Sequence, residues 1–170
     1  MSSAQKKVIV RRFGDHLSWG YLPQDRPAHD GQVELMDTAA RATPLPLKQV
    51  KWIAYVHDFN LTDTTAPERL DRRRFPSRPR TEGLWVRLRF HDGDSLEGLL
   101  QIGVALLAAL GESQGLFLTP PDTRANTQRL FIPRLALESV EPLGLILPSA
   151  KPKPISPVPQ PSLFHEEPTP

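Results

Sequence analysis

Apolar and charged residues alternate most clearly over residues 86–90, where valine, leucine and phenylalanine are separated by arginines. This period of two is typical of a strand that buries one face. The dipeptide Asp92-Gly93 follows, and it favours a hairpin turn because both residues tolerate the positive φ angles of tight turns. The pattern therefore predicts a return strand over residues 95–100, with Gly98 at a bulge or bend.

Short apolar runs continue after this hairpin, at residues 116–118, 130–132 and 135–140. Together with the hairpin they predict about five short strands in roughly 60 residues, which is the density of a small β-barrel or sandwich. Residues 101–112 differ because they are rich in leucine and alanine. Their composition predicts one short helix between the strands.

The first 60 residues of the chain repeat this plan. The parallel segments are 8–22 with 86–100, Gly31–Leu35 with Gly115–Leu118, and 45–50 with 132–137. Aligning residues 8–22 with 86–100 requires the deletion of one residue in the turn. In the pair 45–50 and 132–137, each segment is a short strand that turns at a proline into another short element. The sequence therefore predicts a mainly all-β fold with two tandem copies of one unit, each a small β-barrel or half-barrel.

Shifts in composition divide the chain into four parts. We predict a first β unit at residues 6–60, an arginine-rich linker at 61–82, a second β unit at 83–147 and a disordered proline-rich tail at 148–170. Eight of the 19 prolines lie in this tail. Proline cannot continue a helix or a strand ladder, so the tail is expected to be extended and to act as a tether or a docking peptide.

Charge and cysteine content limit the classes of function that the protein can have. Lysine and arginine number 21 against 19 acidic residues, for a net charge of +2, so binding to nucleic acid would depend on a local patch. The absence of cysteine excludes disulfides and thiolate metal sites. The apolar runs are too short for a signal peptide or a membrane helix. We therefore expect a cytoplasmic protein without membrane insertion.

The sequence contains no set of residues that predicts catalysis. Its five histidines are scattered, without the paired spacing of a metal site. Residues 93–96 match the nucleophile block of one esterase family, but Gly98 is one residue too close to the serine, and His165 lacks an aspartate three residues before it. We expect a non-enzymatic protein with no metal and no cofactor.

Several segments resemble a family of uncharacterised bacterial domains. They are residues 6–8, 50–59, 86–98, 115–126 and 129–132, which follow the family's recurring vkdf, fkDGE…G and GFFL.PaDp.sNn.R.fV segments in that order. The resemblance covers about residues 6–144 and implies no agreed activity. The hairpin at 86–98 is also similar, more distantly, to Sm-like barrels, in which a strand ending in Asp-Gly leads to a strand with a late glycine.

Arginines dominate the predicted linker, and they resemble the motif that precedes the first strand of PilZ domains, which bind cyclic di-GMP. Guanidinium groups suit this ligand because they bind phosphate through two hydrogen bonds and stack on guanine. In PilZ domains a later Asp-x-Ser-x-x-Gly completes the site, and here a glycine, Gly93, stands at the aspartate position. The candidate nucleotide-binding residues are Arg72, Arg73, Arg74, Arg78, Ser95 and Gly98. The alternative interpretation is a solvated basic linker.

Three functional hypotheses follow. The first, which we favour, is a bacterial regulatory or adaptor module that binds a protein partner through exposed sheet edges and the proline-rich tail. The second is a cyclic di-GMP receptor that uses the arginines of the linker. The third is an RNA or single-stranded DNA binder, with Arg11, Arg12 and the linker arginines on the backbone and Phe75 and Trp85 stacking on bases.

Overall fold

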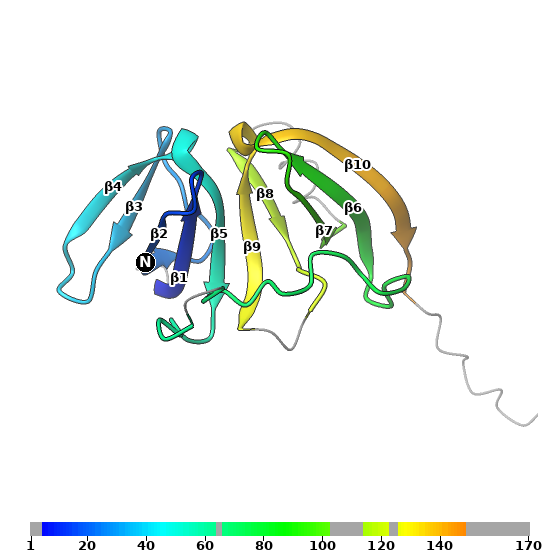
Figure 1. Ribbon diagram of the computed structural model, residues 1–170, viewed down its shortest axis with the longest axis horizontal. Coiled ribbons are helices and arrows are strands. Elements are labelled where there is room, and N and C mark those ends of the chain that lie inside the picture. The colour runs from blue at the N-terminus through cyan, green and yellow to red at the C-terminus, as the bar shows by residue number, and fades with distance from the viewer. Residues whose placement is uncertain (1–4, 64–65, 103–113, 123–125, 149–170) are drawn as a thin grey trace, which may run out of the picture.

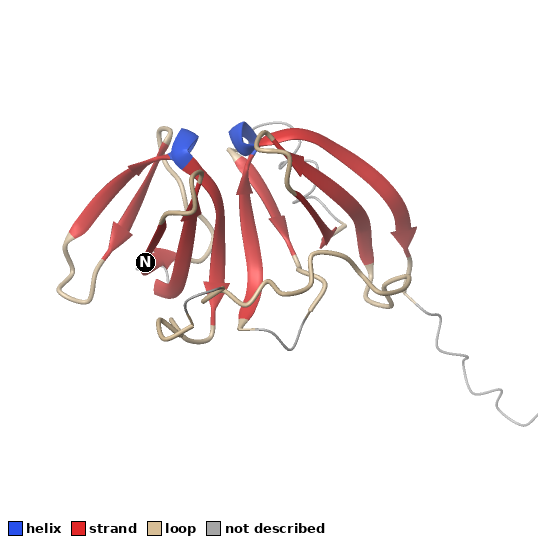
Figure 2. Cartoon of the chain, in the orientation of Figure 1, coloured by secondary structure: helices blue, strands red, loops and turns tan. Residues whose placement is uncertain are grey.

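The computed structural model describes residues 5–63, 66–102, 114–122 and 126–148. These residues form antiparallel strands joined by turns and two short 3-10 helices (Figures 1 and 2). The first half contains β1 (Gln5–Arg12), β2 (Leu17–Pro23), β3 (Gln32–Met36), β4 (Ala42–Pro46), η1 (Leu47–Gln49) and β5 (Val50–Val56). The second half contains β6 (Gly83–Phe90), β7 (Ser95–Leu100), β8 (Gly115–Leu118), β9 (Thr127–Pro133), η2 (Arg134–Ala136) and β10 (Leu137–Ile146). None of the helices described could span a membrane.

The strands form two sheets, one with the order β4-β3-β2-β1-β5-β9-β8 and one with the order β10-β6-β7. The prediction of a mainly all-β fold is confirmed, and so are the five strands of the second half. Of the two predicted forms, barrel or half-barrel, the closed barrel does not occur, because neither sheet closes on itself. Strand β5 pairs instead with β9 of the other half. Of the predicted helix at 101–112, Gln101 and Ile102 are irregular. The rest of it, and the tail from residue 149, lie outside the described residues.

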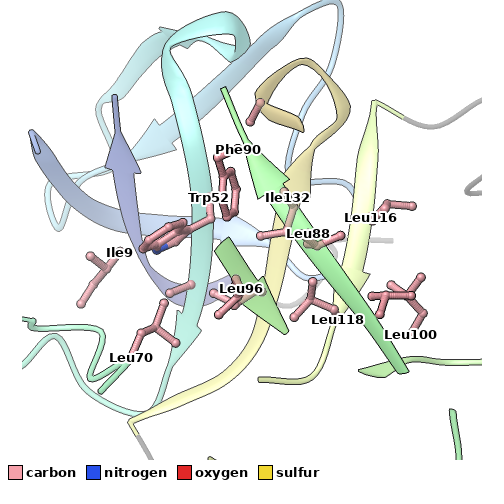
Figure 3. Close-up of a cluster of buried hydrophobic side chains, with 14 of the residues drawn as sticks. Ile9, Trp52, Leu70, Leu88, Phe90, Leu96, Leu100, Leu116, Leu118 and Ile132 are labelled. Carbon is pink, nitrogen blue, oxygen red and sulfur yellow. The ribbon is translucent and has the colours of Figure 1, made fainter. Parts of the chain in front are cut away.

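Strand β5 lies in the interior of the larger sheet, between β1 and β9, and all seven of its residues are buried. Its side chains contribute to two hydrophobic cores. Trp52, Ala54 and Val56 belong to a core with residues of β6 to β9, here called the β6 core, whereas Ile53 and Tyr55 belong to a core with residues of β1 to β4, here called the β3 core. Figure 3 shows the Trp52 side chain beside those of Ile9 and Phe90 in the β6 core, and the Trp52 and Phe90 ring centroids are 5.6 Å apart.

The last strand of each half begins in the same way. A proline ends the fourth strand, a 3-10 helix of three residues follows, and the fifth strand pairs antiparallel with the first strand of that half. The register shifts at the start of both β5 and β10, which leaves Lys51 and Glu138 as extra residues in the ladder. Such bulges turn a side chain out of the regular alternation.

The division of the chain into two units stays a prediction.

Gly98 lies in a regular ladder opposite Val86, so of the predicted bulge or bend at this glycine the bulge is absent. A Cβ atom here would collide with Leu118 Cδ1, and the position therefore requires glycine for close packing of β7 on β8. Gly20 lies opposite Val8 in the first hairpin, and a Cβ atom there would lie 2.8 Å from Leu35 Cγ. Both hairpins pack on the third strand of their half through a glycine.

The registers also correct the alignment of the two halves. In the first turn the Arg12 N–H donates to the carbonyl of His16, and in the second the Phe90 N–H donates to that of Asp94. Both turns therefore have the same length, and no residue is deleted. Gln32 lies opposite Pro46, as Gly115 lies opposite Pro133. Gln32, and not Gly31, therefore corresponds to Gly115.

We predict that Gly98→Ala lowers the free energy of unfolding by about 1–3 kcal/mol, because overpacking forces the backbone of β7 and β8 apart. Gly144→Ala is the matched control, since the nearest atom to a Cβ there is Trp85 Cε3 at 3.9 Å. Urea unfolding followed by circular dichroism measures both. Equal stability of the two variants would contradict this role of Gly98.

Candidate functional site

The arginine-rich segment is held against the smaller sheet. The Arg73 carbonyl accepts a hydrogen bond of 2.8 Å from the Glu97 N–H of β7, and Arg78 Nη2 donates to the Leu145 carbonyl of β10 at 3.2 Å. Strands β7 and β10 flank β6 on opposite sides. The segment therefore crosses from one edge of this sheet to the other (Figure 1). These two hydrogen bonds place Arg73 and Arg78 at opposite edges.

Glu97 anchors this segment. Its carboxylate, only 4% exposed, accepts hydrogen bonds from the Phe75 N–H at 3.1 Å and Trp85 Nε1 at 3.2 Å, and it pairs with Arg87 at 3.1 Å. The carboxylate raises the pKa of Arg87. The rings of Phe75 and Trp85 meet edge to face, with centroids 6.2 Å apart. Both aromatic side chains proposed for base stacking are therefore engaged within the protein.

Lys51 forms a second buried charge cluster at the turn between β6 and β7. Its ammonium group pairs with Asp92 and, at 2.6 Å, with Asp94. It also lies 5.2 Å from the Trp52 ring and 5.3 Å from the Phe90 ring. The bulge in β5 accounts for this orientation, since it turns Lys51 out of the regular alternation. Lys51 and then Arg73, 2.8 Å away, hold the pKa of Asp94 below its usual range.

A third ion pair fixes the start of the arginine-rich segment. Arg11 Nε lies 2.5 Å from Glu68 Oε1, and the Glu68 side chain is 1% exposed. Thr127 of β9 donates a hydrogen bond to the Glu68 carbonyl. The Arg11 and Arg73 guanidinium groups both lie over the Trp52 ring, at 5.6 and 5.8 Å. Lys51, Arg11 and Arg73 thus each pair with a carboxylate beside the Trp52 ring. These contacts hold the arginine-rich segment against β1, β5 and the turn between β6 and β7.

The structure brings only some of the predicted nucleotide-binding residues close together. Arg73 comes close to the turn before Ser95 but pairs with Asp94, Gly98 is buried against β8, and Arg78 bonds to β10. Arg72 and Arg74 are exposed, as expected for a solvated basic segment. Binding of cyclic di-GMP or nucleic acid stays a prediction.

Sequence reasoning missed the three buried charges, Lys51, Glu68 and Glu97. Two of them had a signal in the sequence. Glu97 lies in the strand predicted at residues 95–100, and Lys51 interrupts the apolar run of residues 50–56. A charged residue is seldom buried at such a position without a partner. Within the part of the chain that the structure describes, no group of three or more His, Cys, Asp or Glu residues could hold a metal ion.

Exposed apolar side chains gather at β10. Four of the seven large hydrophobic side chains that are exposed among the described residues lie on or beside this strand: Leu135, Val140, Leu145 and Leu147. The end of β10 also borders a cavity of about 410 Å³, here called the β10 groove. Its lining residues are Arg78, Pro79, Arg80, Leu145, Ile146 and Leu147. The surface combines apolar side chains with two guanidinium groups.

Comparison with known proteins addresses the identity of the chain. The model of a family of unknown function, DUF6982, matches residues 4–144. The chain belongs to this family. The match spans both sheets and confirms the expected membership of an uncharacterised domain family, whereas the PilZ and Sm-like resemblances find no support in it. No curated protein and no solved structure matches this DUF6982 chain.

We predict that Asp94→Asn lowers the stability of the protein by about 1 kcal/mol at pH 7, a small effect because the carboxylate is partly exposed and screened. The pKa of Asp94 is lower in the folded state than its ordinary value of 3.8, so the stabilisation is present above that value. It is lost as the pH falls through the folded-state pKa.

Thermal unfolding of the wild type and Asp94→Asn from pH 2 to pH 7 tests this expectation. The two curves should converge below about pH 4. Asp71→Asn is the control, because Asp71 is exposed and its replacement should leave the curve unchanged. A gap between wild type and Asp94→Asn that stays constant down to pH 2 would contradict the ion pairing described above.

Proposed function

We propose that this DUF6982 protein is a non-enzymatic adaptor that binds a protein partner through the surface of β10. The observation that carries the proposal is the concentration of exposed Val140, Leu145 and Leu147 on and just after one edge strand. Clustered exposed apolar side chains with a polar rim are typical of protein-binding sites. Arg78 and Arg80 beside the groove supply such a rim.

The buried charges support a role without catalysis. Lys51, Glu68 and Glu97 are the charged side chains buried among the described residues, and each binds an oppositely charged side chain. A catalytic acid or base instead needs a free position near a substrate. The three residues therefore serve to hold the arginine-rich segment and the hairpin turn in place.

The arrangement of the two halves also favours β10. We infer that the halves are two copies of one unit, because their strand pairing, 3-10 helices and bulges correspond. In the first copy the outer edge of the fifth strand, β5, is covered by β9. In the second copy the corresponding edge of β10 has no strand partner among the described residues. The partner would occupy the place that β9 occupies on β5.

Prolines limit how this partner can bind. Pro142 has no N–H to offer from β10, and the register shifts next to it, so a long backbone ladder is disfavoured. The edge strand β4 of the larger sheet carries Pro44 and Pro46, and these prolines likewise disfavour the addition of another strand there. The partner would therefore bind mainly through the side chains of β10 and the groove.

Capture of partner proteins from an extract of the source organism tests the proposal. Immobilised wild-type protein is compared with the double variant Val140→Lys, Leu145→Lys, and with Leu61→Lys as a control, since Leu61 is 49% exposed but lies outside β10. We expect one protein to be recovered by the wild type and the control and to be depleted about tenfold with the double variant. Co-elution of that protein with purified wild-type chain confirms direct binding.

The proposal fails if recovery is the same for all three proteins, or if nothing binds the wild type. Circular dichroism of the double variant must match that of the wild type, because both substituted side chains are exposed and their replacement should leave the fold intact.

A further inference from the structure

The β10 groove has the chemistry of a peptide-binding site. Leu145 and Leu147 at its side are 49% and 66% exposed, while Pro79 and Ile146 are buried. Arg78 donates one N–H to the Leu145 carbonyl and makes no other hydrogen bond to the described residues. A guanidinium has five donors, so others can serve a ligand. A ligand that fits this groove carries bulky apolar residues close to acidic ones.

The same chain contains one such segment after β10. Residues 163–167 read Leu-Phe-His-Glu-Glu. Glu166 and Glu167 are the only acidic residues that follow Glu141, and Phe164 is the only aromatic residue after Phe131. The apolar and acidic character that the groove requires is therefore concentrated at one place in the last 23 residues.

The length of the intervening chain allows the segment to reach the groove. Residues 149–162 separate it from Pro148, and at about 3.1 Å per residue they span roughly 40 Å when extended. The groove includes Leu147, one residue before Pro148. A ligand tethered so close to its site has an effective concentration in the millimolar range, so weak contacts suffice to hold it.

We propose that Leu163–Glu167 of this chain binds in its own β10 groove. The apolar pair packs on Leu145 and Leu147, and the two glutamates pair with Arg78 and Arg80. This inference rests on the proposed function, because the segment then covers the surface that the partner protein needs. The tail acts as an internal competitor, and a partner must displace it to bind.

Paramagnetic relaxation in the full-length protein tests the contact. The chain has no cysteine, so Ser162→Cys provides a single site for a nitroxide label. We expect selective broadening of the amide signals of Arg80 and Leu147, which is lost in the variant Arg78→Glu, Arg80→Glu. The broadening should return when Glu166→Arg and Glu167→Arg are added to that variant, because the groove is then acidic and the tail basic, and the two attract each other again.

A mixture of isotope-labelled wild type with unlabelled, nitroxide-bearing Ser162→Cys protein separates binding within a chain from binding between chains. Broadening in this mixture would overturn the proposal, since the occupant would then be a second copy. The absence of selective broadening in the single-chain sample would overturn it as well.

The capture assay distinguishes this inference from the proposed function. In the variant Glu166→Lys, Glu167→Lys, partner recovery at limiting concentration should rise about tenfold if the tail occupies the groove nine-tenths of the time. Unchanged recovery that still depends on Val140 and Leu145 refutes the tail contact and leaves the adaptor function standing. Broadening at the groove without any captured partner refutes the adaptor function alone.

Discussion

The pairing of β5 with β9 is the contact on which both cores depend. Ile53 lies opposite Phe131 in this ladder, and Ala54 lies opposite Leu130. Ile53 and Phe131 contribute to the β3 core, whereas Ala54 and Leu130 contribute to the β6 core. Since successive residues of a strand point to opposite faces, one pair of strands supplies both cores. The two halves of the chain are therefore joined through a shared sheet, and separation at this ladder would expose both cores.

Buried ion pairs determine where the arginine-rich segment lies. Glu68 binds Arg11 of β1, and Glu97 of β7 accepts hydrogen bonds from Phe75 and Trp85. A buried carboxylate without partners is costly, so these contacts leave the segment few alternative positions. Its exposed arginines are consequently spread along the smaller sheet, with Arg73 bound at β7 and Arg78 bound at β10. The same path brings Arg78 to the end of β10 and creates the groove.

Local sequence pattern was sufficient for the strands of the second half and for the turn at Asp92-Gly93. Strand β7 covers residues 95–100 as predicted, because alternation and turn chemistry are properties of neighbouring residues. The role of Gly98 was not accessible in this way. Whether a glycine marks a bulge or a close approach depends on the strand packed against it, and here that strand is β8, 20 residues further along the chain.

The sequence by itself determined that the chain forms short antiparallel strands and that its linker arginines are exposed, since period, turn residues and charge act locally. Tertiary structure alone decided that β5 joins β9, so that one sheet contains strands of both halves. It also decided that Lys51 meets Asp94 across the turn and that Arg78 reaches β10. The choice of strand partner depends on side chains from distant segments packing together, and a local pattern of hydrophobicity does not contain that information.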